Sequence, residues 1–115
     1  MNDIKRLTKN LIEFRDERDW EQFHNPKDVA LSLTLEAVEV LEHFQWKNGA
    51  ELDEYIKTHK DDIGEELADV FNWVLLLSSY LGIDIIKAAD KKLEKNKKKY
   101  PVHKAKGKNT KYDKL

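Results

Sequence analysis

The chain contains no cysteine, only two prolines and four glycines, and no long apolar run. The absence of cysteine excludes disulfides, thiolate-bound metals and cysteine nucleophiles. The scarcity of glycine and proline favours helices over a turn-rich all-β fold. The longest apolar stretch, 70–77, contains Asn72 and is too short to cross a bilayer, and the polar N-terminus is not a secretory signal. We therefore expect a cytoplasmic protein with no membrane partner.

The 115 residues, 40% of them hydrophobic, fit a single domain with a small core. The net charge of −1 hides an asymmetry, because residues 1–90 carry 10 basic and 20 acidic residues while residues 91–115 carry 11 and 2. An acidic body with a basic segment suits a site where cations and a polyanion meet. On charge alone, a solvated basic tail that binds nucleic acid weakly is the simpler interpretation.

Hydrophobic periodicity predicts four helices, with a loop or short helix over 50–58 between the second and the third. Pro26 suits a first helical turn, Gly82 is a natural stop, and Asp84 is a plausible N-cap. The four helices are expected at 3–18, from Pro26 through Phe44, at 60–81 and at 84–99. Because Tyr100-Pro101 breaks the last helix, we expect a domain over 1–101 and a loose basic tail over 102–115.

The second and third predicted helices are apolar on all sides and not along one stripe. A helix of this kind must be buried all round, and a four-helix domain of this size cannot easily bury two of them. The sequence therefore predicts an all-α, four-helix bundle-type domain that assembles as a homo-oligomer, a dimer or a tetramer.

Two pairs of carboxylates interrupt these apolar helices, Glu36 with Glu39 and Glu66 with Asp69. Spacing of three places each pair on one helix face, and ionised carboxylates in apolar surroundings are costly unless something compensates them. The simple alternative is that all four point to solvent. The apolar context favours a metal site, and a ligand set made only of oxygen points to Mg²⁺, with Mn²⁺ as a possible substitute.

Magnesium held by carboxylates usually shares its ligand shell with substrate phosphates. The sequence has no Walker loop or glycine-rich phosphate cradle, so phosphate contacts must come from the metal and from side chains. The fourth predicted helix offers such side chains: Lys91, Lys92, Lys95 and Asn96. A nucleotide or another phosphorylated substrate is therefore expected.

These residues resemble a known family. Glu36-x-x-Glu39 followed by Glu66-x-x-Asp69 is similar to the signature of the all-α nucleoside triphosphate pyrophosphohydrolases, the MazG-like superfamily. The segment Glu17-Arg18-Asp19-Trp20-Glu21-Gln22-Phe23-His24-Asn25-Pro26 resembles the dCTP pyrophosphatase branch, as do Phe44-Gln45-Trp46-Lys47 and the stretch from Lys92 to Pro101. The resemblance extends from about Ile4 to Pro101.

The resemblance implies Mg²⁺-dependent cleavage of a (d)NTP, dCTP or another pyrimidine deoxynucleotide first, to the monophosphate and pyrophosphate. It implies that Glu36, Glu39, Glu66 and Asp69 hold the metal. It further implies substrate-binding roles: His24 and Trp46 at the base, Trp73 at a position that is often Tyr in this branch, and Lys92, Asn96 and Tyr100 at the sugar and phosphates. The corresponding cellular role is cleansing of the nucleotide pool.

Two assignments rest on chemistry alone. Glu39 is our first choice for the group that takes a proton from the attacking water, and Trp20 is expected in the core. A different class of function stays open, a helical oligomeric structural or nucleic-acid-binding protein that uses residues 91–115, although no specific nucleic acid is expected. A family member that binds nucleotides without hydrolysing them is a third interpretation, against which the presence of all four carboxylates argues.

Overall fold

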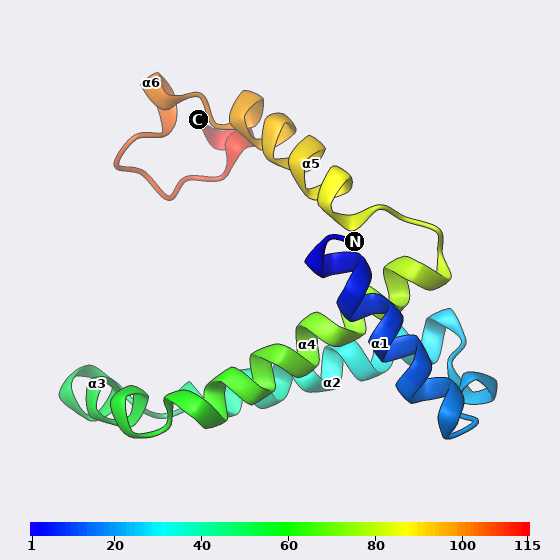
Figure 1. The fold of residues 1–115 in the computed structure, drawn as a ribbon. Helices are drawn as coiled ribbons and strands as arrows, with labels where there is room; N and C mark the ends of the chain where they lie inside the picture. The colour runs from blue at the N-terminus through cyan, green and yellow to red at the C-terminus, as the bar shows by residue number, and fades with distance from the viewer. The chain divides into compact units, whose positions relative to one another are not determined.

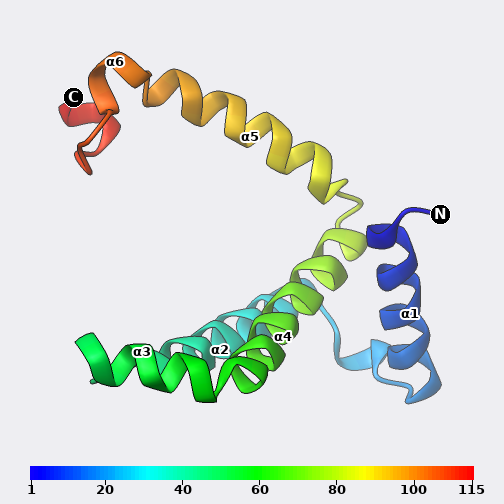
Figure 2. The same ribbon diagram turned by 60° about the vertical axis from the view of Figure 1, so that its left-hand side comes forward.

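The computed structural model describes all 115 residues, which are helical with short connections and fall into two compact units, 1–82 and 83–115 (Figures 1 and 2). The first unit contains α1 (Asp3–Glu17), a 3₁₀ turn (Glu21–Phe23), α2 (Pro26–Phe44), α3 (Gly49–Thr58) and α4 (Lys60–Tyr80). The second unit contains α5 (Ile85–Lys99), α6 (Val102–Ala105) and a 3₁₀ turn (Tyr112–Lys114). The all-helical prediction is confirmed, and the segment left open as a loop or short helix is the helix α3.

The helix boundaries follow from local chemistry that the sequence displays. The Asn25 side chain accepts a hydrogen bond from the backbone N–H of Asp28 at 2.9 Å, and Pro26 opens α2. The Asp84 side chain caps α5 by accepting from the backbone N–H of Lys87 at 3.1 Å, as predicted. Gly82, just past the end of α4, has a φ of 67°, a left-handed conformation that glycine adopts without steric cost.

In the first unit, α4 is the central helix: α2 runs beside it, while α1 and α3 also pack against it (Figures 1 and 2). Its core is small. Val29 of α2 and Ile63 and Leu75 of α4 are 2%, 8% and 1% exposed and are its buried apolar side chains. Three buried residues leave much of the apolar surface of α2 and α4 without a partner inside one chain.

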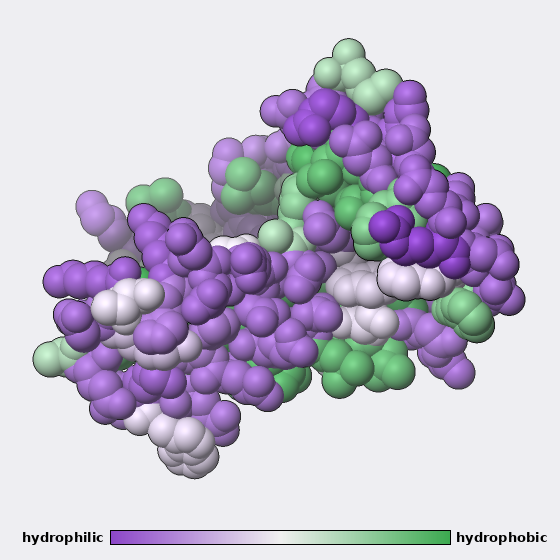
Figure 3. All heavy atoms as spheres, turned by 60° about the horizontal axis from the view of Figure 1, so that its bottom comes forward, coloured by the Kyte–Doolittle hydropathy of each residue, from purple (hydrophilic) through white to green (hydrophobic).

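That apolar surface forms stripes at helical spacing. On α2, four side chains are between 45% and 59% exposed: Leu31, Leu35, Val38 and Leu41. On α4, Leu67 and Phe71 are 53% and 42% exposed. Apolar side chains that reach the surface are visible as green patches among hydrophilic ones in Figure 3. The burial all round expected for these two helices is not achieved within a single chain.

The second unit is the helix α5 followed by a short folded segment. Tyr112 lies edge-on to Tyr100, with ring centroids 6.1 Å apart, and the Lys99 ammonium lies 4.8 Å from the centre of the Tyr112 ring. The segment expected as a loose tail therefore includes α6 and contacts the end of α5.

No single helix of the chain is long and apolar enough to cross a membrane; only α4 and α5 taken together reach that length and composition.

Candidate active site

Three of the four predicted metal ligands meet between α2 and α4. Glu36 and Glu39, one turn apart on α2, and Glu66 of α4 each offer a carboxylate oxygen, and these atoms all lie within 4.8 Å of one another. The contact between α2 and α4 creates this cluster, since the two helices present their acidic residues to each other along their packed faces. Glu39 is the exposed member, whereas Glu36 and Glu66 are half-buried.

The cluster is electrostatically unfavourable when the carboxylates stand alone. One oxygen of Glu36 and one of Glu66 are buried and have no hydrogen-bond partner. A hydrogen bond with Glu39, followed by burial and the nearby negative charges, raises the pKa of Glu66 to about 7. The pKa of Glu36 is also raised, first by burial, then by a hydrogen bond with Glu39 and by the negative charges of Glu39 and Asp69. Unpaired buried oxygens and mutual repulsion are what a divalent cation would relieve.

The residues therefore fit a hard divalent cation, because the donors are all carboxylate oxygens and two of them lack any other partner. Asp69, the fourth predicted ligand, is outside the group of three. It lies one turn beyond Glu66 on α4, and its negative charge contributes to the raised pKa of both Glu36 and Glu66. Asp69 thus faces the cluster, and its role as a ligand stays a prediction.

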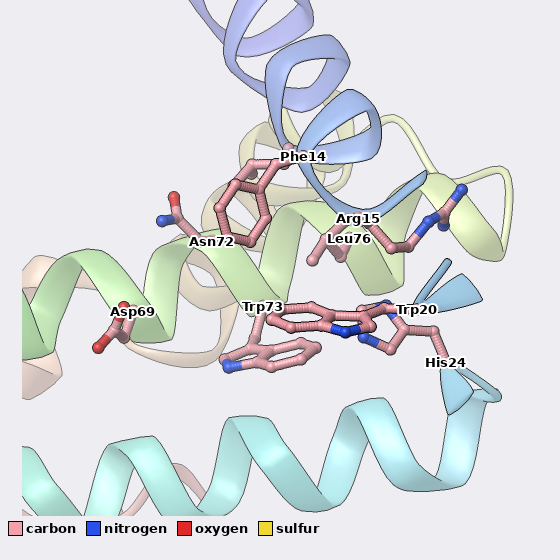
Figure 4. A pocket seen from close by; sticks show the side chains of 9 residues that line it. Phe14, Arg15, Trp20, His24, Asp69, Asn72, Trp73 and Leu76 are labelled. Carbon is pink, nitrogen blue, oxygen red and sulfur yellow. The ribbon is translucent and has the colours of Figure 1, made fainter. Parts of the chain in front are cut away.

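Beside the cluster, a cavity of about 150 Å³ opens between α1, α4 and the segment that joins α1 to α2 (Figure 4). Its lining is mostly apolar and aromatic with a few polar groups: Leu11, Phe14, Arg15, Trp20, His24, Asp69, Asn72, Trp73 and Leu76. Asp69, Asn72 and Trp73 come from one face of α4, at spacings of three and four. The same face continues from Glu66, so a single stripe of α4 leads from the carboxylate cluster into the aromatic cavity.

His24 is a neutral hydrogen-bonding group at this cavity. Its pKa is lowered, first by burial and then by the positive charge of Arg15. Its Nδ1 is buried without a partner, and its ring meets Trp73 edge-on at 5.3 Å. A neutral imidazole has one donor and one acceptor nitrogen, so His24 can read a hydrogen-bonding edge. The structure brings together His24, Trp73 and Asp69 as cavity residues.

The sequence interpretation missed part of this cavity. Trp20, expected in the core, is 44% exposed and stands edge-on to Phe14 at 5.7 Å. The prediction was wrong because Trp20 lies in the segment after α1, where its ring lines the cavity. Phe14, Arg15 and Asn72 were not singled out. Asn72 was detectable, because it lies three residues after Asp69 and so continues the acidic face of α4.

Trp46, predicted beside His24 at the base, lies at the other end of α2. His24 precedes this helix and Trp46 follows it, and the 19 residues of α2 rise about 28 Å. This separation is far larger than a nucleobase, so one base cannot contact both residues of the same chain. The Trp46 side chain is 88% exposed.

Lys92, Asn96 and Tyr100 belong to the second unit. Lys92 and Asn96 are one turn apart on α5, and the backbone N–H of Tyr100 donates to the carbonyl of Asn96 at 2.9 Å. Lys92 and Asn96 therefore share one face of α5, as their spacing of four indicated. Their role at sugar and phosphates stays a prediction from the resemblance.

Comparison with known proteins agrees with this architecture. A model of the MazG-like family matches residues 31–115. The chain is 38% identical to dCTP pyrophosphatase 1 of Rattus norvegicus and 36% identical to that of Homo sapiens, in each case over all of this chain and 67% of the relative. A crystal structure of a pyrophosphatase from Archaeoglobus fulgidus superimposes with a TM-score of 0.82 at 38% identity, covering 88% of this chain and 94% of that one. The chain belongs to the MazG-like family.

Proposed function

We propose that the chain is a nucleoside triphosphate pyrophosphohydrolase that cleaves a dNTP, dCTP or a related pyrimidine deoxynucleotide first, to the monophosphate and pyrophosphate. The observation that carries this proposal is the stripe on α4 that passes from Glu66 through Asp69 to Trp73. Glu66 and Trp73 are separated by about 10 Å of helix axis, a span that suits a triphosphate at one end and a base at the other. The names of the dCTP pyrophosphatase relatives support the same class of hydrolase.

Magnesium, with manganese as a possible substitute, is the proposed cofactor. Glu36, Glu39 and Glu66 would hold it, with Asp69 as a further ligand. Bound there, the ion supplies Lewis-acid stabilisation of phosphate oxygens and lowers the pKa of a water. The protein contributes the position of the carboxylates and a low-dielectric wall on the α4 side.

Glu39 is the proposed acceptor of the water's proton. It is the exposed carboxylate of the cluster, so a solvent-derived water can reach it without rearrangement of α2 or α4. Glu39 also lies close enough to Glu66 to raise the pKa of that carboxyl, so it stands beside the position where the ion would be held.

The cavity on α4 is the proposed base site. Trp20 and Trp73 offer ring faces and edges for stacking, while His24 and Asn72 offer hydrogen-bond donors and acceptors for the base edge. His24 is suited to discrimination, because a hydrogen bond to one base leaves its buried Nδ1 unpaired with another. Lys92, Asn96 and Tyr100 are proposed to contact the sugar and phosphates.

We also propose that the active form is a homo-oligomer in which Trp46 reaches the base site of a second copy. The exposed apolar stripes of α2 and α4 favour such pairing, because stable dimers cover surfaces of this kind. In an antiparallel two-fold pair of α2 helices, the Trp46 end of one copy lies beside the His24 end of the other.

The proposal also includes a cytoplasmic location and a role in cleansing the nucleotide pool. Its domain bounds are 1–101 for the catalytic domain and 102–115 for the basic tail.

The experiment is a product analysis. Canonical and modified dNTPs are incubated with the protein and Mg²⁺, and pyrophosphate, orthophosphate and nucleoside phosphates are measured separately. We expect pyrophosphate and monophosphate in equal amounts, loss of both with chelator, and no turnover by Glu39→Gln. Glu13→Gln, an exposed glutamate of α1 outside the cavity, is the matched control and should act as wild type. Release of orthophosphate with a nucleoside diphosphate would refute this reaction.

A further inference from the structure

The turn after α2 reverses the usual exposure of its two bulky side chains. Trp46 is 88% exposed, whereas the neighbouring Lys47 is half-buried. Hydrophobicity alone would bury the indole and expose the ammonium. Some other interaction must therefore fix the orientation of this turn.

The backbone of the turn is also unfavourable for a tryptophan. Gln45 has φ −59° and ψ 131°, Trp46 has φ 69°, and the N–H of Lys47 donates to the carbonyl of Phe44 at 3.2 Å. These are the features of a type II β-turn with Trp46 at the position that glycine prefers. The left-handed conformation costs a non-glycine residue about 1–2 kcal/mol, so the turn persists only because its surroundings hold it.

Tyr55 of α3 supplies the contact that holds Lys47. The Lys47 ammonium lies 4.3 Å from the centre of the Tyr55 ring, a cation–π geometry. His59, at the start of α4, stacks on the same ring with centroids 3.9 Å apart and planes 9° from parallel. The Tyr55 hydroxyl shares a hydrogen bond of 2.7 Å with Nδ1 of His43 on α2. None of these residues lines the cavity or belongs to the carboxylate cluster.

We propose that Tyr55 is a positioning residue: by anchoring Lys47 between α2, α3 and α4, it fixes the strained turn that projects Trp46 toward a bound nucleotide. The chain on one side of Trp46 is fixed by the end of α2 and on the other by Lys47, so the direction of the indole is set before the substrate binds. Such preorganisation lowers the entropic cost of binding. This inference rests on the proposed role of Trp46 at the base.

The first test is kinetic. Tyr55→Leu removes the ring, and we expect it to raise KM for the dNTP by about 3- to 10-fold, the range that a partly exposed cation–π contact supports, with kcat nearly unchanged. Tyr55→Phe retains the ring and loses the His43 bond, so its KM should fall between wild type and Tyr55→Leu. Ile56→Ala, at the next residue of α3, is the matched control and should leave KM unchanged.

A double-mutant comparison of KM at Tyr55 and Trp46 decides whether Tyr55 positions Trp46 or whether its replacement damages the fold in general. In a Trp46→Ala background, Tyr55→Leu should have no further effect on KM, because the residue it positions is gone. An equal increase in KM in both backgrounds, or a wild-type KM in Tyr55→Leu itself, would overturn the proposal.

The second test does not need turnover. Fluorotryptophan labelling gives a fluorine NMR resonance for each of the three tryptophans, assigned by single Trp→Phe variants. Tyr55→Leu should shift or broaden the Trp46 resonance and leave those of Trp20 and Trp73 in place; an unchanged Trp46 resonance overturns the proposal. Absence of dNTP turnover by the wild type would instead count against the proposed function, with the NMR result still deciding the role of Tyr55.

Discussion

The aromatic side chains near the two ends of α2 differ in how they are held. Near its N-terminal end, His24 and Trp73 of α4 are half-buried and contact each other at the wall of a cavity. At the C-terminal end, Trp46 extends into solvent from a strained turn while Lys47 is half-buried. Burial organises the first end, and backbone geometry with a cation–π contact organises the second.

Under the proposed function, each chain carries two parts of a site that it cannot join by itself. The cavity end continues into the carboxylate cluster along α4, so it would supply the contacts to metal, phosphate and base. The turn end has an exposed ring and a fixed direction but no cavity. A second copy related by a two-fold axis would bring the unlike ends together.

The sharpest test of this comparison is complementation. Glu39→Gln removes the proposed proton acceptor at the cavity end, and Trp46→Ala weakens dNTP binding at the turn end. At a dNTP concentration well below the wild-type KM, the first variant should be inactive and the second weakly active. After the two are mixed, unfolded and refolded, one site of each hybrid dimer combines an intact cluster with an intact Trp46, and we expect about a quarter of wild-type activity. The readout is pyrophosphate release. Activity no higher than the mean of the two separate variants would mean that Trp46 does not serve a partner's site.

The carboxylate cluster gives the next largest effect. Glu66→Gln should reduce turnover by at least about 100-fold, because a proposed metal ligand is lost. The same change should raise the melting temperature of the metal-free protein above pH 7. The pKa of Glu66 is raised to about 7 from 4.5, so its protonated form stabilises the fold at low pH and this stabilisation is lost as pH rises through about 7. Melting curves at pH 5 and pH 8 with EDTA check this; an unstable variant at pH 8 would mean that Glu66 has a structural role.

These effects separate what the sequence could and could not predict. Helix positions were predictable because caps such as Asn25-Pro26, Gly82 and Asp84 act locally. The acidic pairs were predictable because carboxylates contrast with apolar helices. The cavity was not, because its existence depends on how α1 lies against α4, which no residue spacing encodes. The separation of His24 from Trp46 follows from the length of α2, and that arithmetic was available from the sequence.

His24 of the cavity should affect the preference among bases, whereas Lys92 of the second unit should affect the affinity for all dNTPs alike. His24→Ala should change the ratio of kcat/KM between dCTP and other dNTPs, because a directional hydrogen-bonding group at the base is lost. Lys92→Ala should raise KM for every dNTP by a similar factor, since an ammonium contacts phosphate oxygens without reading the base. Steady-state kinetics on four dNTPs measures both. A base-dependent effect of Lys92→Ala beside a uniform effect of His24→Ala would reverse this assignment.

The smallest effect concerns stability at the turn end. Trp46→Gly and Trp46→Ala both remove the indole and should raise KM for the dNTP equally. They should differ in folding: glycine adopts the φ of 69° at Trp46 freely and alanine does not, so the glycine variant should unfold with a free energy higher by about 1 kcal/mol. Gln45, with φ −59°, is the matched control. At this position the alanine variant should be the more stable one, because glycine relieves no strain there and only adds conformational entropy to the unfolded chain. Denaturant titrations of the four variants measure this. If alanine were the more stable replacement at position 46 as well, the turn would not retain its left-handed residue in solution, and the orientation of Trp46 would require another explanation than the anchoring of Lys47.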